Sequence, residues 1–147
     1  MKQTRLLLLT LMCLLMSSAS CLADDRPIPI NQLPAYIKSF VMQAFPNTTI
    51  LAADMEADND GIEYEVYLKD GSEIKFDKRS NWEKVECRGG AVPATIVPEA
   101  ITTYVRTHFP GETITQIERD GNKYEVELSN RLELKFDRNG RFLKVDR

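Results

Sequence analysis

The chain has 147 residues and a formal net charge of -3 at pH 7, with 19 Lys and Arg against 22 Asp and Glu. Nucleic acid is not an expected partner, because binding to phosphates requires a basic surface. The same acidic balance argues against adhesion to an anionic membrane surface.

Residues 1–23 have the pattern of a secretory signal peptide. Lys2 and Arg5 precede an apolar run, and a stretch of mostly small residues leads to Ala23. The apolar run is too short for a comfortable membrane span, and no second run follows, so no transmembrane segment is expected. We therefore predict cleavage after Ala23 and a protein that is periplasmic or secreted. A lipid anchor on Cys21 is the alternative.

Two helices are predicted, one at the start of each of two similar segments. After Pro34 and Pro98, apolar residues recur at the three- and four-residue spacing of a buried helix stripe. The stripes end at Phe45 and Phe109, each followed by a proline that disfavours helical geometry in the preceding residue. His108 falls on the second stripe, where we expect a partly buried histidine bonded to a backbone carbonyl.

The hydrophobic period then changes to two. Residues 64–68 and 124–128 both read Tyr-Glu-Val-x-Leu, an alternation typical of a sheet with one dry and one wet face. Turn signals divide each segment into four strands. A helix on four strands would be marginal alone. We therefore predict an α+β fold in which two tandem α-β-β-β-β repeats, residues 24–88 and 89–147, form one joint domain (24–147).

In this prediction the strands form one broad antiparallel sheet, with both helices packed on one face and the other face open. The plainer interpretation of the open face is a solvated surface held by weak cross-strand Glu–Lys pairs. The functional interpretation is a protein-recognition face with Tyr67 as an aromatic anchor. The residues predicted for partner binding are Tyr67, Glu65, Lys75, Glu125, Glu127, Glu133 and Lys135.

The first repeat carries four extra residues near its first hairpin, at positions 56–61. The spacing of Glu56, Asp58 and Asp60 weakly resembles the start of a calcium loop. The position that should supply a bidentate carboxylate is Tyr67, and no helices flank the segment. A polar hairpin loop is therefore the preferred interpretation, with these three acids as a weak metal candidate.

The remaining residues do not suggest catalysis. Cys87 cannot form an internal disulfide once the leader is removed, and the base that would activate it as a nucleophile cannot be identified. The sequence shows no glycine-rich phosphate loop, no Cys/His metal spacing and no Ser-His-Asp set. We therefore expect no catalytic residues, no cofactor and no enzyme activity.

The repeated motifs resemble those of one family. A Leu-Pro opening, a helix ending in Phe-Pro, Tyr-Glu-Val-x-Leu, Leu-Lys-Phe-Asp and a closing Lys-Val-Asp are similar to the PepSY-like, beta-lactamase-inhibitor-like proteins exported by Bacteroidetes. The resemblance implies a periplasmic or surface module with helices on an antiparallel sheet, and it implies no catalytic residues. We predict a non-catalytic exported protein-binding module that inhibits or regulates a periplasmic or extracellular enzyme. A small-ligand or metal-binding envelope protein is the alternative.

Overall fold

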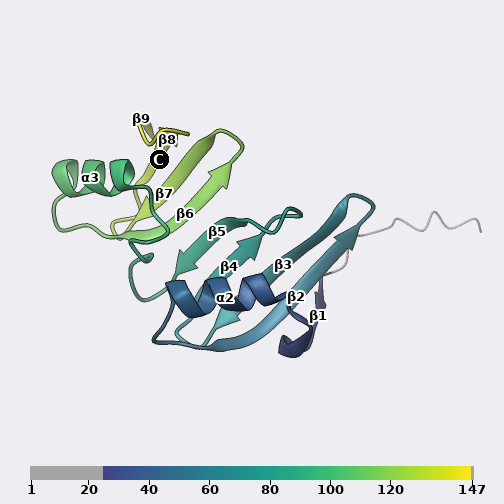
Figure 1. Ribbon diagram of the computed structural model, residues 1–147. Coiled ribbons are helices and arrows are strands. Elements are labelled where there is room, and N and C mark those ends of the chain that lie inside the picture. Colours follow the sequence, from purple (N-terminus) through teal and green to yellow (C-terminus); the bar gives the residue numbers. More distant parts are fainter. Residues whose placement is uncertain (1–24, 147) are drawn as a thin grey trace, which may run out of the picture.

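The computed structural model describes residues 25–146 (Figure 1). The predicted signal peptide, its cleavage site after Ala23 and the alternative anchor at Cys21 lie outside this range. Within the described residues, no helix combines the length and the apolar character that crossing a membrane requires.

The described chain contains nine strands in a single sheet, and each strand lies beside its neighbours in sequence. Two α-helices, each ahead of four consecutive strands, confirm the predicted α+β fold of two tandem repeats. The elements are β1 (Arg26–Pro27), η1 (Ile30–Gln32), α2 (Ala35–Ala44), β2 (Ile50–Asp58), β3 (Gly61–Leu68), β4 (Ser72–Phe76), β5 (Trp82–Cys87), α3 (Glu99–His108), β6 (Ile114–Asp120), β7 (Lys123–Leu128), β8 (Glu133–Asp137) and β9 (Phe142–Asp146).

A proline lies at each end of both helices and determines where the helix starts and stops. Pro34 and Pro98 occupy the positions just before α2 and α3, where a missing N–H costs no helical hydrogen bond. Phe45 and Phe109 leave the helical region, with φ of -127° and -131°, because a proline follows each of them. The two helices therefore have the same length and present equivalent faces to the sheet.

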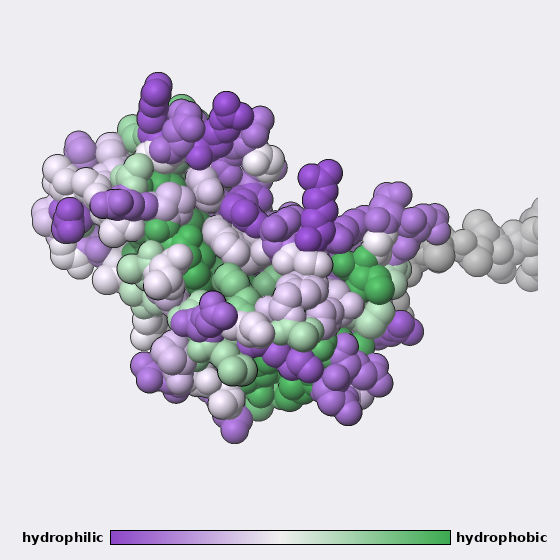
Figure 2. All heavy atoms as spheres, in the orientation of Figure 1, coloured by the Kyte–Doolittle hydropathy of each residue, from purple (hydrophilic) through white to green (hydrophobic). Residues whose placement is uncertain are grey.

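Both helices cover the same face of the sheet. The ring of Phe40 on α2 meets Phe76 edge-on at 5.5 Å, and Tyr104 on α3 meets Phe136 in the same way at 5.4 Å. Figure 2, in the orientation of Figure 1, shows apolar residues gathered around and between the helices. Beneath them, paired positions on β2 to β8 form one buried row across the sheet: Ala53, Val66, Ile74, Val85, Ile117, Val126 and Leu134.

The two repeats join between β5 and β6, which we call the seam. Here β5 and β6 pair in antiparallel register, with Lys84 opposite Glu118, Val85 opposite Ile117 and Glu86 opposite Gln116. Val85 and Ile117 have no exposed surface, so the cores of the two repeats are continuous through them. The predicted broad sheet with both helices on one face is therefore confirmed.

A cation–π contact reinforces the seam. The guanidinium of Arg119 on β6 lies 4.3 Å from the centre of the Trp82 ring on β5. The Nε of Arg119 also donates a 2.8 Å hydrogen bond to the Trp82 carbonyl. This bond and the stacking tie the second repeat to the first beyond the sheet ladder itself.

The structure corrects one prediction and adds one element. The four extra residues of the first repeat do not form a loop, because Glu56 and Asp58 belong to β2 and the pairing with β3 runs to Gly61. The insertion therefore lengthens both strands and leaves a two-residue turn. The added element is β1, which pairs with β2 through Arg26 and Pro27 and makes a ninth strand.

The last hairpin turn of each repeat has a different residue at its left-handed position. Gly140 has φ of 78° in the second repeat, whereas Ser80 has φ of 70° in the first. A Cβ atom at Gly140 would come within 2.8 Å of the Ala100 Cβ at the start of α3. Glycine is therefore required in the second repeat both for its backbone conformation and for its close approach to the helix.

Exchanging these two turn residues tests the difference. Gly140→Ser should lower the free energy of unfolding by about 1–3 kcal/mol, because a side chain is strained at positive φ and would crowd Ala100. Ser80→Gly should leave the free energy of unfolding unchanged or raise it by up to about 1 kcal/mol, because glycine relieves the strain. Urea unfolding measures both values, and equal losses in the two variants would contradict the explanation.

Candidate partner-binding face

The face of the sheet opposite the helices, which we call the open face, carries charge in a regular pattern. Paired positions place two acids and then two lysines across the strands, and the repeat produces this order twice. From β2 to β9 the row is Asp54, Glu65, Lys75, Lys84, Glu118, Glu125, Lys135 and Lys144. Unlike charges therefore face each other at the seam and within each repeat.

A second row on the open face, which we call the acidic row, contains five carboxylates and no lysine or arginine. It lies two residues along the strands from the first row and contains Tyr67, Glu73, Glu86, Gln116, Glu127, Glu133 and Asp146. Like charges on neighbouring strands repel each other, so this row does not stabilise the sheet by itself. The lysines and arginines that pair with these carboxylates lie outside the row.

The lysines of the first row pair with several carboxylates. Lys135 lies 3.2 Å from Glu125 and 2.9 Å from Asp146, and these carboxylates raise the pKa of its ammonium group, Asp146 most strongly. The reverse effect of Lys135 lowers the pKa of Asp146. Lys75 turns away from Glu65, its register partner, and lies 3.2 Å from Glu63. Such exposed pairs contribute at most about 1 kcal/mol each, so they keep the face soluble rather than hold the fold.

Tyr67, the residue predicted to anchor a partner, is the aromatic member of the acidic row. Its half-buried ring lies on the open face of β3, and its hydroxyl donates a 3.0 Å hydrogen bond to Glu65. Partial burial, followed by this bond to a carboxylate, raises the pKa of the phenol. In the second repeat, Glu127 occupies the corresponding position, so the two repeats contribute different side chains to the acidic row.

The structure brings the predicted site residues together as two groups rather than one. Tyr67, Glu65 and Lys75 lie on β3 and β4, before the seam. The second group lies beyond the seam on β7 and β8 and consists of Glu125, Glu127, Glu133 and Lys135. Between the two groups lie the open-face residues of β5 and β6, which are Lys84, Glu86, Gln116 and Glu118. Sequence reasoning did not select them, because their position depends on the pairing of β5 with β6, which are far apart in the chain.

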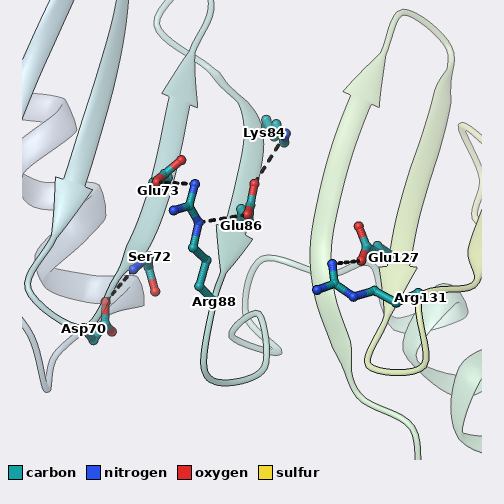
Figure 3. Close-up of polar contacts among 8 residues, drawn as sticks. All are labelled: Asp70, Ser72, Glu73, Lys84, Glu86, Arg88, Glu127 and Arg131. Atoms are coloured by element: carbon teal, nitrogen blue, oxygen red, sulfur yellow. Dashed lines mark hydrogen bonds and ion pairs between the residues drawn. The ribbon is translucent and has the colours of Figure 1, made fainter.

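A hollow with both polar and apolar lining lies on the open face between these two groups. Its volume is about 710 Å³, and it forms where β5 and β6 separate beyond Glu86 and Gln116. Arg88 pairs with Glu73 at 2.9 Å and with Glu86 at 3.2 Å on one side. On the other side of the gap, Figure 3 shows Arg131 beside Glu127 in the β7–β8 hairpin, and the two side chains form an ion pair of 3.0 Å. Each arginine thus neutralises part of the acidic row beside the hollow.

Arg131 is held in an unfavourable backbone conformation. Its φ is 69°, in the left-handed region, whereas Gly71 occupies the corresponding turn position of the first repeat with φ of 86°. The Arg131 side chain is 87% exposed, so its pairing with Glu127 contributes little to stability. The ion pair of Arg131 therefore does not offset the cost of its backbone conformation.

Replacing Arg131 separates its strain from its ion pair. Arg131→Gly should raise the free energy of unfolding by up to about 1 kcal/mol, because glycine adopts positive φ without the steric penalty. Arg131→Ala keeps the strain and removes the ion pair, so it should lower the free energy of unfolding by a few tenths of a kcal/mol, about 0.5 at most. Urea denaturation compares the two, and a loss of stability in Arg131→Gly would show that the arginine supports the fold.

The weak metal candidate is engaged in structural contacts. Asp58 accepts hydrogen bonds from the backbone N–H groups of Asp60 and Gly61 at 2.8 and 3.1 Å. The Lys78 ammonium lies 2.6 Å from its other oxygen and lowers the pKa of Asp58. Glu56 lies away from this turn, opposite Glu63 on β3. Across residues 25–146, no group of three or more His, Cys, Asp or Glu side chains is arranged to hold a metal ion.

The other two reactive side chains have ordinary surroundings. Cys87 is a buried free thiol, and burial raises its pKa, which keeps it protonated. The Nδ1 of His108 donates a 3.0 Å hydrogen bond to the Tyr104 carbonyl, as expected. The predicted burial of His108 is wrong, because it is exposed and stacks on the outer side of Tyr104 with ring centres 4.0 Å apart.

Two α-β-β-β-β repeats that share one sheet, with a charged open face, define a class of tandem-repeat sheet modules. The chain belongs to the PepSY-like family described as "Putative beta-lactamase-inhibitor-like, PepSY-like", whose profile matches residues 22–61 and 62–144. The boundary between the two matches lies in the β2–β3 hairpin rather than at the seam, so the repeat limits 24–88 and 89–147 stay a prediction.

Solved structures of Bacteroides proteins share this fold. A Bacteroides thetaiotaomicron protein described as a "putative calcium-regulated periplasmic protein" is 42% identical, with a TM-score of 0.78 over 84% of this chain and 98% of that chain. A periplasmic protein of Bacteroides vulgatus is 40% identical, with a TM-score of 0.77 over the same shares. Another from that organism is 32% identical, with a TM-score of 0.78 over 84% of this chain and all of its own.

These relatives confirm the predicted family and the periplasmic location. The chain has no match among curated proteins. The comparisons therefore identify the fold and the compartment, and the function has to be argued from the open face.

Proposed function

We propose that this protein is a non-catalytic periplasmic module that binds another protein through its open face and thereby inhibits or regulates an enzyme. The observation that carries this proposal is the acidic row beside the seam hollow. Both helices pack on the opposite side of the sheet, so no helix of the described residues covers this row. Nothing in the fold itself requires such a concentration of carboxylates.

The charge of the open face indicates the chemistry of the partner. The four acids and four lysines of the first row balance in charge, whereas the five carboxylates of the acidic row have, among the described residues, only Arg88 and Arg131 as further cations. The face therefore keeps a negative surplus, which favours a partner with a basic surface and speeds their encounter. Tyr67 adds an aromatic side chain at one end of the row, and such residues dominate the energetics of interfaces.

The size of the sheet also supports a protein partner. Neighbouring strands lie about 4.8 Å apart, so nine strands make a surface roughly 40 Å wide. A standard interface buries about 800 Å² on each partner, which is a patch somewhat narrower than this sheet. The open face can therefore hold a complete interface within one molecule.

The surroundings of the nucleophilic and basic side chains support a non-catalytic role. The Cys87 thiol is buried and protonated, and His108 lies on α3, on the helix side of the sheet. A nucleophile and its base must lie within hydrogen-bonding distance to act together. The only cysteine and the only histidine of residues 25–146 have no contact with each other, since His108 bonds and stacks with Tyr104.

Capture of a partner from periplasmic extract tests the proposal. The wild-type protein should retain a specific partner, and Glu125→Lys with Glu133→Lys should reduce its recovery at least about tenfold, because reversed charges repel a basic surface. The control is Glu99→Lys on α3, which reverses one charge on the helix side and should leave recovery unchanged; each open-face substitution made singly gives the variant matched to it in charge. Equal recovery by the open-face variant and the wild type would refute the open face as the binding surface.

Exchanging one residue between the repeats adds a test of specificity. Tyr67→Glu gives the first repeat the residue of the second, and Glu127→Tyr makes the opposite change. If Tyr67 anchors the partner, Tyr67→Glu lowers recovery and Glu127→Tyr does not.

A second candidate function is the binding of a metal ion or small ligand. What favours it is a hollow of about 60 Å³ on the open face, where Asp54, Glu56, Glu63 and Glu65 surround Lys75. The similarity to a protein described as calcium-regulated points in the same direction. Against it, Lys75 already pairs with Glu63 there and occupies the place of a cation.

Titration with calcium distinguishes the two functions. A protein-binding module should show no saturable heat and no rise in Tm when calcium reaches about 1 mM, the range of weak extracellular sites. A saturable heat that disappears in Glu56→Gln with Glu63→Gln, and persists in Asp58→Asn, would support the second candidate at this hollow.

A further inference from the structure

The two edge strands of the sheet, β1 and β9, differ in how well they block the addition of another strand. At the first edge, β1 is a two-residue strand that contains Pro27, and Ile28 donates a 2.9 Å hydrogen bond to the Ala53 carbonyl of β2. Short strands with prolines are a common way to block strand addition. At the other edge, β9 has five residues and, within the described chain, pairs only with β8. It also exposes Leu143 (49%) and Val145 (41%).

The seam shows what the strand equivalent to β9 does when it has a partner. Lys84, Val85 and Glu86 of β5 correspond to Lys144, Val145 and Asp146 of β9. On β5 these residues form the three pairs with β6, and Val85 is fully buried. On β9 the same pattern of basic, aliphatic and acidic residues has no second strand beside it among the described residues, and the valine is exposed. Lys144 and Asp146 pair with each other at 3.1 Å, as Lys84 and Glu86 do at 3.5 Å on β5.

We propose that β9 pairs with β9 of a second copy of this protein, antiparallel about a two-fold axis at Val145. In this register Val145 lies opposite Val145 of the partner subunit, and Lys144 lies opposite Asp146 of the partner subunit. Because of the two-fold axis, the pairing of Lys144 with Asp146 of the partner subunit occurs twice, once on each side of Val145. The β9 strand is therefore complementary to itself in both charge and shape. The three pairs equal the number that joins the repeats at the seam.

Position and charge favour this arrangement over other pairings of the same strand. Val145 is the register partner of buried Leu134, so its side chain continues the buried row on the helix side. A shift that centred the axis on Lys144 would bring two lysines together. A head-to-tail chain of copies would require β9 to pair with β2, whose edge is already occupied by β1.

The dimer would be weak, because a contact of a few residue pairs is smaller than a standard interface. It would leave the open face free and would place the open faces of the two copies side by side on one continuous sheet. Loss of dimerisation and loss of partner capture can therefore be told apart, since the variants for each lie on different surfaces.

Sedimentation of the purified protein between about 5 and 500 µM, the range of weak association, tests the proposal. Wild-type protein should shift from monomer towards dimer mass as the concentration rises, and Val145→Lys should remain monomeric, because an edge lysine prevents strand addition. The matched control is Ile62→Lys, which alters a residue on the same side of the sheet with 40% exposure and should dimerise like the wild type. A wild-type monomer throughout, or a dimer unaffected by Val145→Lys, would overturn the proposal.

Crosslinking tests the register without depending on the stability of the lysine variant. Val145→Cys places two thiols opposite each other at the axis, where oxidation by diamide should join the copies by a disulfide. Wild-type protein, with its buried Cys87, and Ile62→Cys should remain uncrosslinked. A dimer in which Val145→Cys fails to crosslink would overturn the two-fold pairing at this residue.

Discussion

The pairing of Val85 with Ile117 at the seam is the contact on which the rest of the structure depends. Both side chains are fully buried, and burying residues of this size contributes about 1.5–3 kcal/mol each. This pair joins the cores of two units of about sixty residues, each too small to be secure alone. Because it aligns the two sheets in one register, both helices share a face and the opposite face becomes continuous.

The charges of the open face follow from the same register. Crossing the seam preserves the order of two acids and two lysines, and it also aligns the acidic row from one repeat to the next. The exposed ion pairs add little to stability, and the acidic row opposes it. The strained Arg131 beside the hollow adds to this cost. The acidic row and the strained Arg131 thus lower stability, and binding of a protein partner by the open face would explain why they are present.

Local patterns predicted most elements correctly, and the failures have physical reasons. Phe-Pro steps marked the helix ends, and alternation marked the strands. The insertion at residues 56–61 was predicted to be a polar hairpin loop, but pairing between β2 and β3 extends both strands through most of it. Two residues are too few for β1 to show a period. His108 has helical spacing, yet it lies outside Tyr104 and away from the core.

The sequence by itself determined the repeat, the family, the strand faces and the residues that share the open face, because side-chain alternation is a local property of each strand. It could not determine which open-face residues are neighbours across strands. Tertiary structure alone opened the hollow between Arg88 and Arg131, and it made β9 an edge strand of the sheet among the described residues. These features depend on the pairing of β5 with β6, which brings together residues that no sequence spacing relates.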